Sequence, residues 1–160
     1  MQHLSRTFAF LLCLCLVITS FSGCTKNENL TVKEISDSLK TFSSDIVWTQ
    51  LSGDQLTSYF GFEADIAEEY ETYVNSSDDH FDMIAVIKPT DDAARESIIK
   101  GLNFAMSSAS GNFKNSNQSE YKKITSGRIV EADGILVLVI VDNYEKIGKY
   151  FNDIGAKTPK

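Results

Sequence analysis

The chain contains little of several residue types that particular protein classes require. Its 160 residues include 2 Pro and 9 Gly, so neither a collagen-like repeat nor a low-complexity linker dominates it. It has 2 His and 3 Cys, too few for the usual clusters of transition-metal ligands. It also lacks an excess of positive charge: its net charge is −7, whereas nucleic-acid-binding surfaces are basic. We therefore predict no metal site and no nucleic-acid partner.

The short motifs that mark common catalytic sites are also missing. Neither the Gly-x-x-x-x-Gly-Lys-Ser/Thr phosphate loop nor Gly-x-Gly-x-x-Gly occurs, so no nucleotide cofactor is indicated. A Ser–His pair would have to use His80, which no catalytic signature accompanies. Neighbouring acids such as Glu68 with Glu69 often arise by chance in a chain with 22 acidic residues, so they are expected to be solvated. We predict no cofactor, no catalytic residue and no enzymatic activity.

The first residues form a pattern typical of a secretory signal. A polar start with one cation, Arg6, precedes an uncharged apolar run from Phe8 to Ile18. A run of about a dozen residues is shorter than the roughly 20 that span a bilayer as a helix. A buried core helix is the alternative, but the run is apolar on every side. We predict a signal peptide over residues 1–23.

The end of this leader, Phe21-Ser22-Gly23-Cys24, is similar to the lipobox of bacterial lipoproteins. Small residues precede a cysteine whose thiolate is nucleophilic enough to take up a diacylglyceryl group. Phe21 stands where Leu is usual, and ordinary signal-peptide cleavage near Ser20 or Gly23 is the alternative. We predict cleavage between Gly23 and Cys24, with Cys24 as the lipidated residue.

Lipidation would place the protein on the extracytoplasmic face of the cell membrane. Cys13 and Cys15 would leave with the leader, so the remaining chain would have one Cys and no internal disulfide. Loss of Arg6 would make the remainder more negative than the −7 of the whole chain. Such a charge does not favour binding to anionic lipid head groups, so the acyl chains would have to hold the protein at the membrane. Residues 24–30 are predicted to be a short polar tether.

Hydrophobic spacing predicts the helices and strands of the rest of the chain. Helices are expected over residues 31–42, over a short segment ending at Gly61, over 92–108 and from Asp142 onward. Strands are expected over residues 69–74, 83–88, 128–132 and 135–141, with 46–51 as a short β-prone segment and 112–119 as a loop. Residues 69–74 also tolerate a helix. Asp133-Gly134 supplies the positive φ angles of a two-residue hairpin turn.

The order of these elements predicts an α+β fold. An antiparallel sheet of about four strands, in ββαββα order, carries helices packed on it and is preceded by N-terminal helices. The apolar strand at residues 135–141 is expected to be central, so the face opposite the main helices would need cover from the N-terminal ones. The length of 160 residues agrees with one domain, which we place at residues 31–156.

Several segments together resemble a known family of bacterial lipoproteins. They are Tyr59-Phe60-Gly61-Phe62, residues 73–77, residues 83–88, Tyr121, Gly134 before residues 135–141, and a last helix ending near Phe151. The family, mostly Gram-positive, is known as domain of unknown function 4358, and the resemblance covers residues 31–154. It implies a surface lipoprotein with a small α+β domain, and it implies no activity, ligand or catalytic residue.

Two groups of side chains are candidates for a site. His80 with Asp78, Asp79 and Asp82 offers oxygen and nitrogen ligands, but the spacing matches no calcium loop, so a solvated hairpin tip is expected. Aromatic residues crowd the N-terminal half and would line a binding groove if they were exposed together. Core packing is the alternative for these aromatic residues. The candidate binding residues are Trp48, Tyr59, Phe62 and Tyr73.

Two functions are compatible with these observations. The first is a non-catalytic binding or interaction module, anchored in the membrane through Cys24, whose partner is a protein or a small ligand. The second is a small cell-envelope enzyme that uses carboxylates as acid and base, which needs two acids facing each other in a cleft. We prefer the first, because the sequence contains no catalytic signature.

Overall fold

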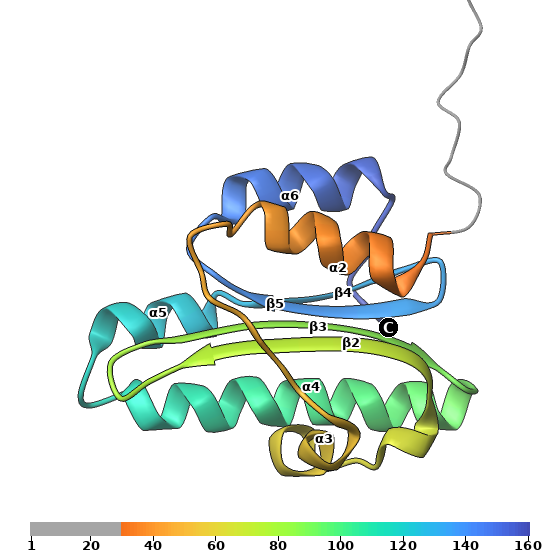
Figure 1. The fold of residues 1–160 in the computed structure, drawn as a ribbon, viewed down its shortest axis with the longest axis horizontal. Coiled ribbons are helices and arrows are strands. Elements are labelled where there is room, and N and C mark those ends of the chain that lie inside the picture. The colour runs from red at the N-terminus through yellow and green to blue at the C-terminus, as the bar shows by residue number, and fades with distance from the viewer. Residues whose placement is uncertain (1–29) are drawn as a thin grey trace, which may run out of the picture.

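The computed structural model describes residues 30–160, which form five α-helices and one five-stranded antiparallel sheet (Figure 1). In chain order the elements are α2 (Val32–Thr41), β1 (Thr49–Gln50), α3 (Gly53–Phe60), the short 3-10 helix η2 (Ala64–Ile66), β2 (Ala67–Ser76), β3 (Phe81–Pro89), α4 (Asp92–Phe113), α5 (Gln118–Thr125), β4 (Arg128–Ala132), β5 (Ile135–Ile140) and α6 (Tyr144–Asp153). The predicted α+β class is therefore confirmed. The predicted signal peptide, the tether up to residue 29 and Cys24 lie outside the described residues.

The strands lie in the order β1-β2-β3-β5-β4, and neighbouring strands are antiparallel. Four long strands match the prediction, and the two-residue β1 adds a fifth at one edge. The ambiguous segment at residues 69–74 lies within β2 and is a strand. All six residues of β5 are buried, as expected for an interior strand with both faces covered.

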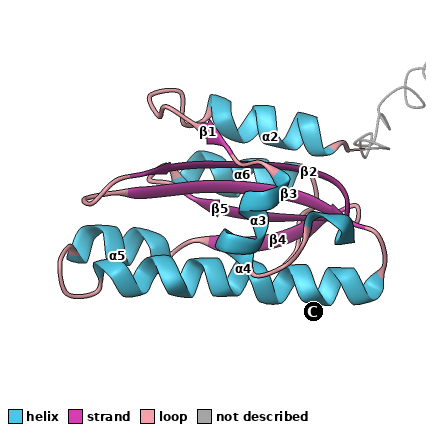
Figure 2. Ribbon diagram, turned by 60° about the horizontal axis from the view of Figure 1, so that its bottom comes forward, coloured by secondary structure: helices cyan, strands magenta, loops and turns pink. Residues whose placement is uncertain are grey.

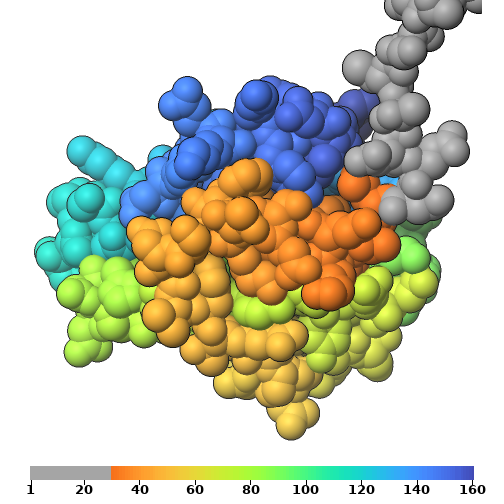
Figure 3. Space-filling view, turned by 45° about the horizontal axis from the view of Figure 1, so that its top comes forward, coloured from red at the N-terminus to blue at the C-terminus, as the bar shows by residue number. Residues whose placement is uncertain are grey.

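Helices cover both faces of the sheet, so the domain has three layers (Figures 1 and 2). On one face α3, α4 and α5 enclose what we call the α4 core, which includes Leu102, Met83 and Leu138. On the other face α2 and α6 lie side by side (Figure 3) over what we call the α6 core, which includes Ile35, Ile84 and Val137. The expected cover of the second face by an N-terminal helix is therefore found in α2, and α6 lies beside it on that face. None of the described helices is both long and apolar enough to cross a membrane.

Local sequence signals fix several element ends. The capping box at the start of α2 is formed, since Thr31 Oγ1 accepts from the Glu34 backbone N–H at 3.2 Å and Glu34 accepts from the Thr31 N–H. Gly61 ends α3 in the left-handed region, with φ of 75°. Asp133 and Gly134 have φ of 51° and 76°, which closes the β4–β5 hairpin with the predicted two-residue turn.

One segment differs from its prediction. The stretch at residues 112–119, expected to be a loop, contains the end of α4 and the start of α5, and α5 itself was not predicted. Asn117 caps α5, because its Oδ1 accepts from the N–H groups of Ser119 and Glu120. The helix is short and mostly polar, so it carries little hydrophobic periodicity, and tertiary contacts rather than its own pattern stabilise it.

Candidate functional site

The four aromatic candidates do not form one groove, because the sheet separates them. Trp48 and Tyr73 pack against the α6 core, whereas Tyr59 and Phe62 pack in the α4 core on the opposite face. Phe62 is buried, and it lies so close to α4 that a Cβ at Gly101 would be 2.5 Å from its ring. Phe62 is therefore packed as a core residue.

Tyr73 is already engaged by neighbouring side chains. Its hydroxyl donates to Glu71 at 3.0 Å and accepts from Lys40 at 3.1 Å, and the same ammonium group lies 4.2 Å from the ring centroid. Lys40 also pairs with Asp37 at 3.0 Å. Trp48 is half-buried, and its Nε1 has no hydrogen-bond partner within residues 30–160. These contacts link α2 to β2, so Tyr73 presents no free polar group to a ligand.

The acidic hairpin between β2 and β3 divides into two separate groups. At its tip, Nδ1 of His80 contacts both Ser77 Oγ, at 2.6 Å, and Asp79 Oδ1, at 3.0 Å. Asp82 instead contacts Lys123 of α5. Among the described residues no group of three or more His, Cys, Asp or Glu side chains is placed to hold a metal ion.

A serine, a histidine and an aspartate do meet at this hairpin, but in a different geometry from a catalytic triad. In a triad the two ring nitrogens of the histidine contact the serine and the acid separately, so that the ring relays a proton. Here Ser77 and Asp79 share Nδ1 of His80, and Nε2 faces Asn75 Oδ1 at 3.2 Å. The hydrogen bond from Ser77 and the contact with His80 lower the pKa of Asp79. The arrangement stabilises a tight turn.

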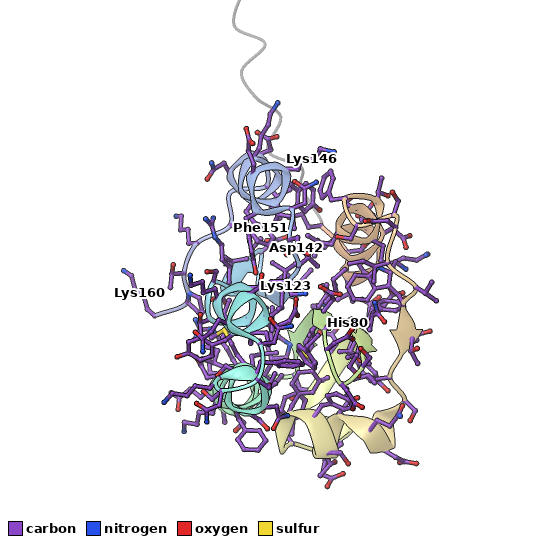
Figure 4. The ribbon with its side chains drawn as sticks, turned by 90° about the vertical axis from the view of Figure 1, so that its left-hand side faces the viewer. His80, Lys123, Asp142, Lys146, Phe151 and Lys160 are labelled. Atoms are coloured by element: carbon purple, nitrogen blue, oxygen red, sulfur yellow. The ribbon has the colours of Figure 1, made fainter. Side chains whose placement is uncertain are left out.

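The most strongly buried charges of the described chain surround Lys123, at the end of the sheet where α5 meets β3. Its Nζ lies 2.8 Å from Asp82 Oδ1 and 2.8 Å from Glu120 Oε2, and the three side chains are 6%, 7% and 14% exposed. The Glu120 carboxylate also accepts from the Phe81 N–H, and the Tyr144 hydroxyl donates to the Lys123 carbonyl. Figure 4 shows Lys123 at this end, with Asp142 of the β5–α6 connection nearby.

Opposing effects act on the ionisation of this cluster. Burial lowers the pKa of Lys123, but hydrogen bonds to Asp82 and Glu120 outweigh it and raise the pKa above its usual value. Burial raises the pKa of Asp82, and the Lys123 ammonium opposes that rise. Burial also raises the pKa of Tyr144 to about 12. Two carboxylates thus converge on a cation in the interior, rather than on each other in an open cleft.

A different region provides open space. A groove of about 450 Å³ runs along the outer edge of β4 beneath α6, which is within the size range of small-ligand sites. Its walls are residues 127–130 of the β4 edge, Gly148, Phe151 and Asn152 of α6, and Ala156 and Thr158 of the C-terminal segment. Gly148, Phe151 and Asn152 share one face of α6, because their spacing is three and four residues. Figure 4 shows Phe151 on the side of α6 that faces the sheet.

Backbone contacts hold the three walls of the groove in place. Gly155, with φ of 70°, turns the chain back after α6, and the Ala156 N–H donates to the Phe151 carbonyl at 2.8 Å. Lys157 then pairs with Glu131 of β4 through two backbone hydrogen bonds of 2.7 and 2.9 Å. At the other end, a Cβ at Gly127 would lie 2.9 Å from the Ile124 carbonyl, so glycine permits the close approach of α5 to β4.

Arg128 supplies the only charge in the lining of this groove. Its side chain is exposed, and a Cβ at Gly148 would lie 3.5 Å from its Nη1, which places the guanidinium group against α6. Within residues 30–160, Arg128 has no ion-pair partner within 4.0 Å. Asn152 and Thr158 add an amide and a hydroxyl to the lining, while Val130 and Phe151 add apolar surface.

Sequence reasoning missed this groove. The hydrophobic spacing places Arg128 on a strand with no role, and it predicts a helix from Asp142 onward without a functional face. The one signal was Gly148 in the middle of a helical pattern, since a glycine there weakens the helix and indicates a packing or functional reason. No local pattern predicts that α6 lies over the β4 edge, because that position depends on the direction the chain takes between β5 and α6, at residues 141–143.

The comparisons with known proteins give one match. The family model described as Domain of unknown function (DUF4358) matches residues 43–141. The matched stretch contains the whole sheet with α3, α4 and α5, and it leaves out α2 and α6. Neither the curated proteins nor the solved structures gave a match. Because the family model covers more than half of the chain, the protein belongs to the DUF4358 family, as its sequence resemblance indicated.

Proposed function

We propose that the protein is a lipoprotein held on the extracytoplasmic face of the cell membrane, where its domain acts as a non-catalytic binding module. The anchor would be Cys24, which follows an apolar leader and the small residues Ser22 and Gly23. Two acyl chains on this cysteine hold a protein durably, whereas one chain holds it only reversibly.

The start of the described domain supports an anchored arrangement. Leu30 is six residues after Cys24, and a fully extended stretch of that length spans at most about 20 Å. A lipid on Cys24 would therefore keep the domain close to the membrane surface. The net charge of −7 argues against direct adhesion to anionic lipid, so the covalent anchor carries the attachment.

The observation that carries the binding role is the groove along β4, with Arg128 exposed in it. The chain has 22 acidic residues, yet the described part places none of them within ion-pair distance of this guanidinium group. The groove brings one uncompensated charge together with an amide, a hydroxyl and some apolar surface, and a few convergent polar groups of this kind fix the orientation of a small ligand. The partner of the module would be the occupant of this groove.

The anchor is tested by substitution of the thiol in the producing bacterium. Cys24→Ser should abolish acylation, so that the protein is released from the membrane fraction or stays as an uncleaved precursor. Cys15→Ser is the matched control, because it makes the same change inside the leader and should leave membrane retention intact. Intact-protein mass spectrometry reports the new amino end and the acyl mass. An unchanged mass and unchanged retention in Cys24→Ser would refute the anchor.

A further inference from the structure

We propose that the groove between β4 and α6 recognises a carboxylate group, which pairs with Arg128 while the rest of the ligand lies along the β4 edge. The inference rests on the proposed binding role and names its ligand chemistry. It goes beyond the aromatic residues and the anchor that the sequence indicated.

The positive charge in the groove favours a ligand with a negative charge. Arg128 is the only ionisable side chain in the lining, and it stands in a chain whose net charge is −7. Some cations of the described chain have carboxylate partners, since Arg95 pairs with Glu131 through two hydrogen bonds and Lys123 pairs with two acids. Within the same residues, Arg128 shares its lack of a partner with several surface lysines, but it is the one that lines the groove. An anion in the groove would give Arg128 the partner that the domain itself does not supply.

The shape of the guanidinium group favours a planar anion. Arginine presents parallel N–H donors that match the two oxygens of a carboxylate, a geometry that adds specificity to the charge attraction. The guanidinium group lies beside Gly148, because a Cβ at this position would be 3.5 Å from Nη1. The Asn152 amide and the Thr158 hydroxyl offer further hydrogen bonds from the facing walls.

The β4 edge offers backbone groups beside Arg128. In an antiparallel ladder successive residues point their N–H and C=O groups to alternate sides, and Glu131 uses its own pair to bind Lys157 at the outer edge. The backbone N–H and C=O groups of Ile129, two residues before Glu131, therefore point to the same outer edge. Pro159, which would lie opposite Ile129 if the pairing continued, has no N–H to donate. A ligand with an extended backbone finds a donor and an acceptor here, next to the charge.

The apolar part of the lining limits the body of the ligand. Val130 and Phe151 are 9% and 4% exposed and form the inner surface of the groove. The apolar surface that they offer is small, which suits a carboxylate with a short apolar body. Two sources share this chemistry, namely a free organic acid and the carboxyl end of a peptide.

The experiment uses the full chain, purified in detergent, and four probes in isothermal titration. The probes are acetate, N-acetyl-trialanine with a free carboxylate, the same tripeptide as its C-terminal amide, and inorganic phosphate. We expect the tripeptide acid to bind, and the amide to bind at least about tenfold more weakly. Amide signals of Gly127 and Gly148 in nitrogen-labelled protein should shift with the acid, which locates the binding in the groove.

Two variants distinguish binding in the groove from a general effect of positive charge on the protein surface. Arg128→Gln removes the guanidinium group and should weaken binding of the tripeptide acid by at least about tenfold. Lys146→Gln removes one positive charge from the exposed side of α6, outside the groove lining, and should leave the affinity within about twofold. Circular dichroism should show both variants folded, since both replaced side chains are exposed.

Each outcome has a defined consequence. If acetate binds as tightly as the tripeptide acid, the ligand source is a free organic acid. If the tripeptide acid binds more tightly than acetate, the source is the carboxyl end of a peptide. Equal binding of acid and amide, phosphate as strong as the acid, unchanged affinity in Arg128→Gln, or no binding up to about 10 mM would each overturn the proposal. Because these measurements use purified protein, they leave the test of the anchor at Cys24 independent.

Discussion

Lys123 and Arg128 are two cations of the same acidic domain in opposite electrostatic settings. Lys123 is buried at the α5 end of the sheet and contacts Asp82 and Glu120, whereas Arg128 is exposed in a groove and has no ion-pair partner in the described chain. A buried charge must be compensated within the fold, because the interior cannot solvate it. An exposed charge carries no such requirement, so its pairing remains available to a ligand. Lys123 thus stabilises the fold, whereas Arg128 is the residue that the proposed function assigns to ligand binding.

The largest effect that distinguishes the two regions is expected at Lys123. Lys123→Met leaves Asp82 and Glu120 buried without a cation, which should lower the free energy of unfolding by about 3 kcal/mol. Urea unfolding followed by circular dichroism measures the change. Lys122→Met is the matched control, because Lys122 is exposed and its loss should cost less than about 0.5 kcal/mol. Equal stability of the two variants would contradict the structural role of Lys123.

A smaller effect, visible in acid, is expected at the Arg95–Glu131 pair on the α4 side of β4. Hydrogen bonds from Arg95 hold the pKa of Glu131 below its usual value of 4.5. The folded protein therefore binds this proton less tightly than the unfolded chain, so the contribution to stability is complete above pH 4.5 and is lost as the pH falls through the folded pKa.

Glu131→Gln tests this pH dependence. Its deficit in unfolding free energy relative to the unchanged protein should be constant near neutral pH and should shrink below pH 4.5. Urea titrations across the acid range measure it. A deficit that stays constant down to pH 3 would show that the ion pair has no part in it. Backbone pairing with Lys157 does not involve the side chain, so the groove wall should persist in the variant.

The smallest effect is expected at two helical glycines, where it separates ligand binding from stability. Gly148→Ala and Gly111→Ala each replace a helical glycine, and each should raise the free energy of unfolding by about 0.5–1 kcal/mol. A Cβ at Gly111 meets nothing within 4 Å, whereas one at Gly148 narrows the space beside Arg128. Only Gly148→Ala should weaken binding of the tripeptide acid. Thermal unfolding and titration of both variants test this, and equal affinities would show that the groove is wider than described.

The sequence was most informative where a segment's structure depends on its own residues. The strand at residues 135–141, the Asp133-Gly134 turn and the helix end at Gly61 were all predicted, because periodicity and positive φ are local properties. The sequence was least informative over α5. That helix has a weak apolar pattern of its own, and its contacts run from Lys123 to Asp82, a pair 41 residues apart.

The candidate site follows the same division. Aromatic residues were grouped because they are close in the sequence, yet Trp48 and Phe62 lie on opposite faces of the sheet. The groove joins β4, α6 and the C-terminal segment, which carry no common motif. The sequence alone therefore determined the α+β class, the family and the pattern around Cys24. Whether a cation is compensated inside the fold or left exposed depends instead on tertiary contacts, because it depends on where distant acids such as Asp82 come to lie.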